Sequence, residues 1–83
     1  MNSTKYVVLD YQGFDTIFMF PGFIGHSDFV ASFINPVVIS AGFIEVYDND
    51  AFAYGESVSL GIKARDEDSR LAKRALCLGS EYD

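Results

Sequence analysis

The sequence predicts an α+β fold with the element order ββαββα, in which a four-stranded, mainly antiparallel sheet has two helices packed on one face. Two observations lead to this prediction. Four segments have the β-branched and aromatic composition of strands, and two others have apolar residues at helical spacing. A length of 83 residues is enough for one modest core, so we expect a single domain over residues 1–83.

The first two strands are expected at residues 5–11 and 16–20. Both segments are apolar, and Gln12-Gly13 between them is a turn candidate. The second segment ends at Pro21-Gly22, where proline removes a backbone donor from the ladder. The two strands therefore form a predicted hairpin.

A short helix is expected next. Ser27 is the expected N-cap, Asp28 lies in the first turn, and Asn35-Pro36 ends the pattern. Its docking face is apolar and aromatic, made of Phe29, Val30, Phe33 and Ile34. The only histidine, His26, precedes the cap and is expected to have a capping or surface role.

The central stretch, residues 37–62, predicts a second hairpin around Asp48-Asn49-Asp50, with a bulge or twist near Gly42. Alternation along its second arm separates a bulky face from a bare one. The bulky face holds Phe52, Tyr54, Glu56, Val58, Leu60 and Ile62, and the bare face holds Ala53, Gly55, Ser57, Ser59 and Gly61. We expect the bulky face to point inward and the bare face to receive a helix of the chain, another subunit or a ligand.

The C-terminal helix has clearer boundaries. Asp66 is its expected N-cap and Gly79 the residue that ends it. Its apolar stripe consists of Leu71, Ala72, Ala75, Leu76 and Leu78. Cys77 adjoins this stripe and is expected to be buried or partly buried, and a lone cysteine excludes an intramolecular disulfide.

The formal net charge of −6 argues against direct nucleic-acid binding, since phosphate contacts need clustered Lys and Arg. Eight Phe and five Tyr exceed what so small a core encloses. We therefore expect exposed aromatic surface that binds a protein partner or forms a homodimer. No apolar run approaches the roughly 20 residues of a membrane span or resembles a signal peptide, which predicts a soluble, cytoplasmic protein without a membrane partner.

No motif of known chemistry is present, so we expect no catalytic residues, no metal and no cofactor. One histidine and one cysteine, far apart in the sequence, are a poor ligand set for a metal. Ser57 and Ser59 fit neither the G-x-S-x-G elbow of a nucleophile nor a phosphate loop. Glu56 is expected to pair with a base or a backbone amide rather than to act as a general base. The chain is therefore predicted not to be an enzyme.

Two surfaces are candidate binding sites. The first is the acidic and aromatic end of the central hairpin, with partner-binding residues Glu45, Tyr47, Asp48, Asp50 and Tyr54. The second is a possible anion site made of Ser57, Ser59, Lys63 and Arg65, near the start of the last helix and Arg70. The acids of the first surface could also be ordinary turn residues, and the bases of the second could simply pair with Asp66, Glu67 and Asp68.

Residues 40–71 contain the segments SAGF and YGESVSLGIK, followed by Arg65, Glu67 and Asp68 in the pattern R-x-E-D. This pattern resembles small uncharacterised proteins of bacteriophages and prophages. The resemblance implies a phage origin and a place in the host cytoplasm. By analogy with small acidic phage proteins such as anti-CRISPR proteins, it implies an inhibitor of a host defence complex.

Two functions follow as hypotheses. The first is a small non-enzymatic acidic protein that inhibits a host protein or nucleoprotein complex through its acidic and aromatic surface. The second is an oligomeric sponge that sequesters a small anionic metabolite or signalling nucleotide.

Overall fold

The computed structural model describes residues 3–78, which begin with an antiparallel hairpin. β1 (Thr4–Tyr11) pairs with β2 (Phe14–Pro21) along its whole length. The turn residues Gln12 and Gly13 both have positive φ, 55° and 86°, as the tight hairpin turn between twisted strands requires. The predicted first hairpin is therefore present, with both strands slightly longer than expected.

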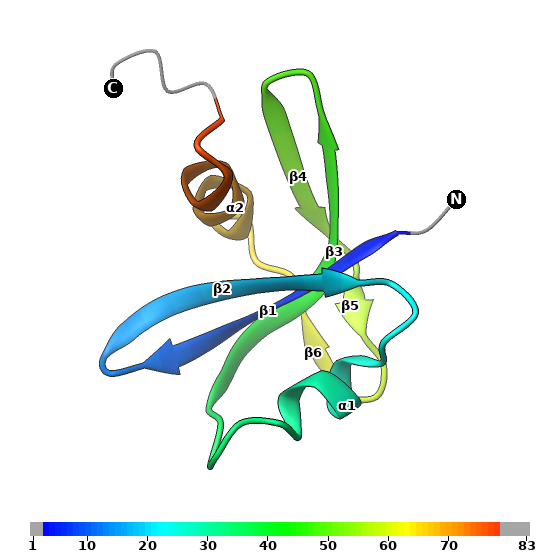
Figure 1. Cartoon of the computed structure of the whole chain (residues 1–83), viewed down its shortest axis with the longest axis vertical. Helices are drawn as coiled ribbons and strands as arrows, with labels where there is room; N and C mark the ends of the chain where they lie inside the picture. Colours follow the sequence, from blue (N-terminus) through cyan, green and yellow to red (C-terminus); the bar gives the residue numbers. More distant parts are fainter. Residues whose placement is uncertain (1–2, 79–83) are drawn as a thin grey trace.

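β3 (Val38–Tyr47) lies beside β1 on its other side, and β4 (Asp50–Tyr54) pairs with the second half of β3. The strand order is β2-β1-β3-β4 and every pairing is antiparallel. The prediction of an α+β fold with a four-stranded antiparallel sheet and two helices is confirmed. Figure 1 shows the β3–β4 hairpin projecting away from the β1–β2 hairpin.

The prediction that the second arm continues as one strand to Ile62 is wrong. Gly55 has a φ of +78°, and the chain turns there instead of continuing past Tyr54. A Cβ at Gly55 would come within 3.1 Å of the Phe43 ring, so glycine suits this turn in both conformation and space. The remaining residues form a separate two-stranded sheet, β5 (Glu56–Ser57) and β6 (Ile62–Lys63).

The two helices, α1 (His26–Val30) and α2 (Asp68–Leu76), contact different core clusters. Successive residues of β1 point to opposite faces of the sheet, and the clusters divide them accordingly. The cluster under α2 contains Tyr6, Val8, Ile44, Ala51 and Ala72, and the cluster under α1 contains Val7, Leu9, Phe20, Val30 and Ala41. The prediction that both helices pack on one face is therefore wrong. Each face of the sheet is covered by a different helix, and Figure 1 shows the helices on either side of the β1–β2 hairpin.

The face under α1 is also covered by the β5–β6 hairpin. Leu60 and Ile62 pack against the same cluster as α1. Because the five-residue α1 is too short to cover this face alone, the β5–β6 hairpin covers the rest of the cluster.

The ends of α2 differ from those predicted. Asp68, rather than Asp66, provides the carboxylate at its start, where it accepts the Arg65 backbone N–H at 2.9 Å. The helix ends at Leu76, because Cys77 adopts a left-handed conformation with φ of 58°. Gly79 lies outside the described residues. Cys77 is exposed, contrary to prediction.

The expected bulge near Gly42 lies slightly earlier in β3. The β1–β3 register shifts between Val8 and Leu9, opposite Ser40 and Val38, so the extra residue is Ile39. Gly42 instead marks a close approach, since a Cβ there would collide with the Tyr54 carbonyl oxygen. No helix within residues 3–78 has the length and apolar character needed to cross a membrane.

Candidate functional site

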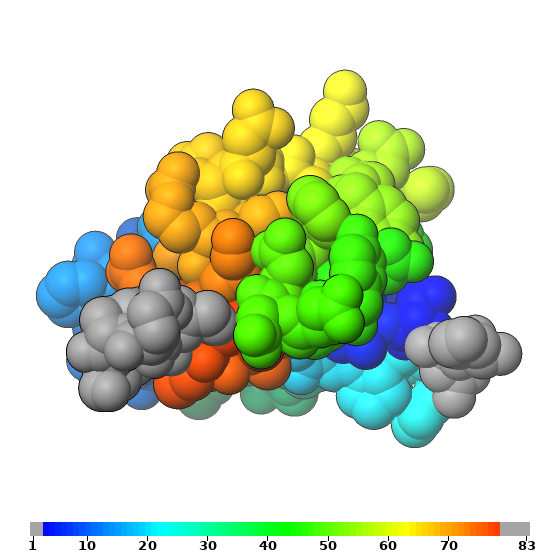
Figure 2. Space-filling model, turned by 90° about the horizontal axis from the view of Figure 1, so that it is seen from above, coloured from blue at the N-terminus to red at the C-terminus, as the bar shows by residue number. Residues whose placement is uncertain are grey.

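The outer half of the β3–β4 hairpin extends beyond the rest of the sheet. β1 begins at Thr4, which pairs with Ile44, so within residues 3–78 the β3 residues after Ile44 pair only with β4. In Figure 2 the hairpin tip, coloured green, projects toward the viewer beside the orange α2. One face of this hairpin lies under α2, and on the other face Glu45, Tyr47, Phe52 and Tyr54 are exposed and belong to neither core cluster.

The uncovered face carries an unusual set of side chains, which we call the aromatic–carboxylate ladder. Antiparallel register pairs its residues as Phe43 with Tyr54, Glu45 with Phe52, and Tyr47 with Asp50. Side chains of directly opposed residues lie on the same face, so four rings and two carboxylates form three adjacent cross-strand pairs.

The outer rings of the ladder are half exposed yet ordered by their neighbours. Tyr47, Phe52 and Tyr54 retain 49%, 47% and 45% of their accessible surface. The Tyr47 and Phe52 ring centroids are 5.9 Å apart, and those of Phe43 and Tyr54 are 5.8 Å apart. Half-exposed rings held at these distances form a preorganised apolar surface.

The carboxylates near the ladder are in different states. Glu45 and Asp48 are exposed, and no basic side chain within residues 3–78 lies at ion-pair distance from either. Asp50 accepts the Ala51 N–H at 2.9 Å and pairs with Lys73 Nζ at 3.2 Å. These two contacts hold the pKa of Asp50 below its usual value. Glu45 is thus the unneutralised carboxylate at the centre of the ladder.

The structure brings together most of the predicted partner-binding residues. Glu45, Tyr47 and Tyr54 lie on the ladder, Asp48 forms the hairpin turn with φ of 54°, and Asp50 closes the ladder while held by Lys73. Sequence reasoning missed Phe52. Its alternation with Tyr54 was visible, but the bulky face was expected to point inward, which is wrong for both residues.

The other face of β4 is covered by α2. Ala51 is 1% exposed and shares a core cluster with Ala72 of the helix. The outward backbone donors of this edge strand are occupied: Ala53 N–H donates to Ser69 Oγ at 2.9 Å, and Ala51 N–H donates to Asp50. An occupied edge does not readily accept an added strand, so a partner would engage this hairpin through its side chains.

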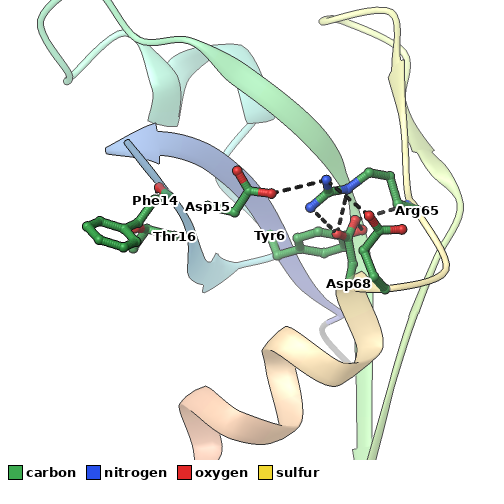
Figure 3. A network of polar contacts seen from close by, with 7 residues as sticks. Tyr6, Phe14, Asp15, Thr16, Arg65 and Asp68 are labelled. Atoms are coloured by element: carbon green, nitrogen blue, oxygen red, sulfur yellow. Dashed lines mark hydrogen bonds and ion pairs between the residues drawn. The ribbon is translucent and has the colours of Figure 1, made fainter. Parts of the chain in front are cut away.

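A buried polar network anchors α2 to the sheet (Figure 3). Tyr6 and Asp68 are fully buried, and the Tyr6 hydroxyl donates to Asp68 Oδ2 at 2.5 Å. Arg65 donates Nε–H to Asp68 Oδ1 at 3.0 Å, and its Nη1 pairs with Asp15 at 3.2 Å and Glu67 at 3.4 Å. The network therefore joins β1, β2 and the start of α2.

Titration in this network follows from burial and hydrogen bonding. Burial opposes ionisation of Asp68, but hydrogen bonds from Tyr6 and Arg65 outweigh it and hold the Asp68 pKa below its usual value. Burial raises the pKa of Tyr6 far above its usual value, and the Asp68 carboxylate raises it further. The neutral phenol and the ionised carboxylate thus form a stable structural pair.

The predicted anion-site residues are not gathered in one pocket. Ser57 is 1% exposed, and its hydroxyl accepts the Leu60 N–H at 3.1 Å. The Ser57 hydroxyl in β5 lies 3.4 Å from the Ser59 hydroxyl in the turn that follows, whereas the Arg65 guanidinium pairs with Asp15, Glu67 and Asp68. Lys63 lies opposite Glu56 in the β5–β6 register, and Glu56 is exposed instead of pointing inward.

His26 is buried, contrary to its expected capping or surface role. It is 5% exposed, with Nε2 2.9 Å from the Gly42 carbonyl oxygen. Its ring is edge-on to Phe20 and Phe43, at centroid distances of 5.6 and 5.7 Å. Among residues 3–78, no three His, Cys, Asp or Glu residues form a group that could hold a metal ion.

No family model, curated protein or solved structure matches the chain. A proposal of function therefore rests on the surfaces described above.

Proposed function

We propose that this chain is a non-enzymatic binding protein that contacts a basic surface of a protein partner through the aromatic–carboxylate ladder. The observation that carries the proposal is the placement of Glu45, which forms no ion pair with residues 3–78, among the half-exposed rings of Tyr47, Phe52 and Tyr54.

The chemistry of the ladder favours arginine on the partner. A guanidinium group is planar, stacks on aromatic faces and binds carboxylates in a bidentate manner. Glu45 lies directly opposite Phe52, so one guanidinium could stack on the ring while it donates to the carboxylate. The net charge of −6 adds long-range attraction to a basic partner. Blocking a basic surface of a host defence complex is the inhibitory use that the resemblance to phage proteins implies.

Synthetic peptides test this chemistry without a known partner. An arginine-rich peptide and the same peptide with citrulline, the uncharged isostere of arginine, are titrated into the protein and followed by amide NMR shifts. We expect the arginine peptide to shift Glu45 and Phe52, and citrulline to weaken binding at least about tenfold because the ion pair and most cation–π attraction are lost.

Matched variants separate the ladder from the general acidity of the protein. Glu45→Gln and Asp66→Asn each remove one exposed carboxylate, but only the first lies on the ladder. Glu45→Gln is expected to weaken binding about fivefold, and Asp66→Asn less than about twofold. Equal effects of the two substitutions, or equal binding of the citrulline peptide, would show that net charge alone attracts the peptide and would reject the proposal.

A further inference from the structure

A groove lies between α2 and the edge strand β2, on the opposite side of α2 from β4. It consists of two adjoining depressions of about 290 and 250 Å³ that share Asp15, Leu71 and Arg74. The first is completed by Arg65, Glu67 and Arg70, and the second by Thr16, Ile17 and Ala75. Together they fall within the roughly 300–1,000 Å³ typical of small-molecule sites.

The polar end of the groove has two arginines, Arg70 and Arg74, that form no ion pair with residues 3–78. Arg65 is held by Asp68, Asp15 and Glu67, so its charge is matched inside the protein. Arg70 and Arg74 are exposed, one helical turn apart, and neither forms an ion pair with any residue in 3–78.

This arrangement has a cost in the free protein. Like charges four residues apart on a helix repel each other, by a few tenths of a kcal/mol. The acids that also line this end, Asp15 and Glu67, are both directed to Arg65 Nη1. An anion between Arg70 and Arg74 would relieve the repulsion and gain charge-assisted hydrogen bonds.

The other end of the groove is apolar. Ile17 and Leu71 belong to the shell of partly buried residues around the core cluster under α2, and Ala75 lies one turn after Leu71. An apolar group placed here would remove carbon surface from water at both the strand and the helix.

We propose that this groove binds a small amphiphilic anion, with its carboxylate or phosphate between Arg70 and Arg74 and its apolar body over Leu71 and Ile17. The groove shares Arg65 with the predicted anion site but none of Ser57, Ser59 and Lys63, and it shares no residue with the aromatic–carboxylate ladder. Failure of either proposal therefore leaves the other intact.

Three probes test the site: octanoate, octyl phosphate and inorganic phosphate, each titrated at low salt into the isotope-labelled full-length chain. We expect saturable amide shifts at Ile17, Leu71 and Ala75 with at least one of the two amphiphiles, and the tighter of them identifies the preferred head group. Inorganic phosphate should bind much more weakly because it leaves the apolar end empty.

Two single substitutions provide the decisive comparison. Arg74→Gln removes one positive charge from the groove, and Lys63→Gln removes one from the exposed strand β6. Arg74→Gln should weaken binding of the amphiphile at least about fivefold, and Lys63→Gln less than about twofold. The proposal is overturned if neither amphiphile saturates at millimolar concentrations, if inorganic phosphate binds equally well, or if the two substitutions have equal effects.

Discussion

The two faces of the β3–β4 hairpin use side chains of opposite size. Ala51 and Phe52 are neighbours on β4, but Ala51 is 1% exposed beneath α2 and Phe52 is 47% exposed on the open face. The difference shows that side-chain size here reflects how closely another element approaches. A helix can lie against this edge strand only because the strand presents alanines, while the rings occupy the face with room for them.

The covered face depends on the buried network that holds α2, so breaking that network should have the largest effect. Asp68→Ala leaves the Tyr6 hydroxyl and the Arg65 amide without their acceptor in a buried site. We expect the free energy of unfolding to fall by about 3–4 kcal/mol, measured by urea denaturation.

Asp68→Asn serves as the second variant, because it keeps an acceptor oxygen and removes the charge. It should destabilise the protein less than Asp68→Ala. A loss below about 1 kcal/mol for Asp68→Ala would contradict the role of Asp68 as the anchor of α2.

A matched pair of substitutions tests the contrast between the faces directly. Ala51→Leu inserts a larger side chain between β4 and α2, and overpacking of this kind costs about 1–3 kcal/mol. Phe52→Ser removes a half-exposed ring and should cost less than about 1 kcal/mol, since it forfeits one cross-strand contact with Tyr47. Thermal unfolding of both variants gives the order, and a larger loss for Phe52→Ser would mean that the ring belongs to the core.

Sequence reasoning located the ladder but assigned its orientation incorrectly. Strand periodicity correctly placed Phe52 and Tyr54 on one face and the small residues on the other, because alternation depends only on local geometry. Which face is covered depends on where α2 docks, and α2 is held there by long-range contacts such as the hydrogen bond between Tyr6 and Asp68, which lie 62 positions apart. In the sequence, a buried and hydrogen-bonded aspartate at the start of a helix cannot be distinguished from an exposed acidic residue in the first turn.

The sequence also did not predict that the strand β4 ends before Gly55. Glycine in an apolar, alternating segment is compatible with a continuous strand or a turn, and the φ of +78° arises where the chain leaves β4 and the Phe43 ring lies against Gly55. The predicted anion site drew Ser57, Ser59 and Lys63 from this segment, which the turn at Gly55 places in the separate β5–β6 hairpin.

The smallest expected effect concerns His26, the first residue of α1. Its ring contacts Phe43, the innermost ring of the ladder. Burial lowers the pKa of His26, the bond to the Gly42 carbonyl partly opposes this, and the Lys5 ammonium lowers it further. Above the unfolded-state pKa of about 6.5, both states are neutral at this position and His26 adds no pH dependence.

As pH falls below that value, the unfolded chain binds a proton that the folded protein resists, so stability decreases. We expect the free energy of unfolding, measured with urea, to decrease from pH 7 to pH 5. This window lies above the range in which Asp50 and Asp68, whose pKa values are lowered, begin to protonate. His26→Gln keeps a donor for the Gly42 carbonyl and removes the titration, so its stability should change less over the same window. An unchanged slope in this variant would mean that other groups, and not the buried imidazole at this boundary, cause the acid sensitivity.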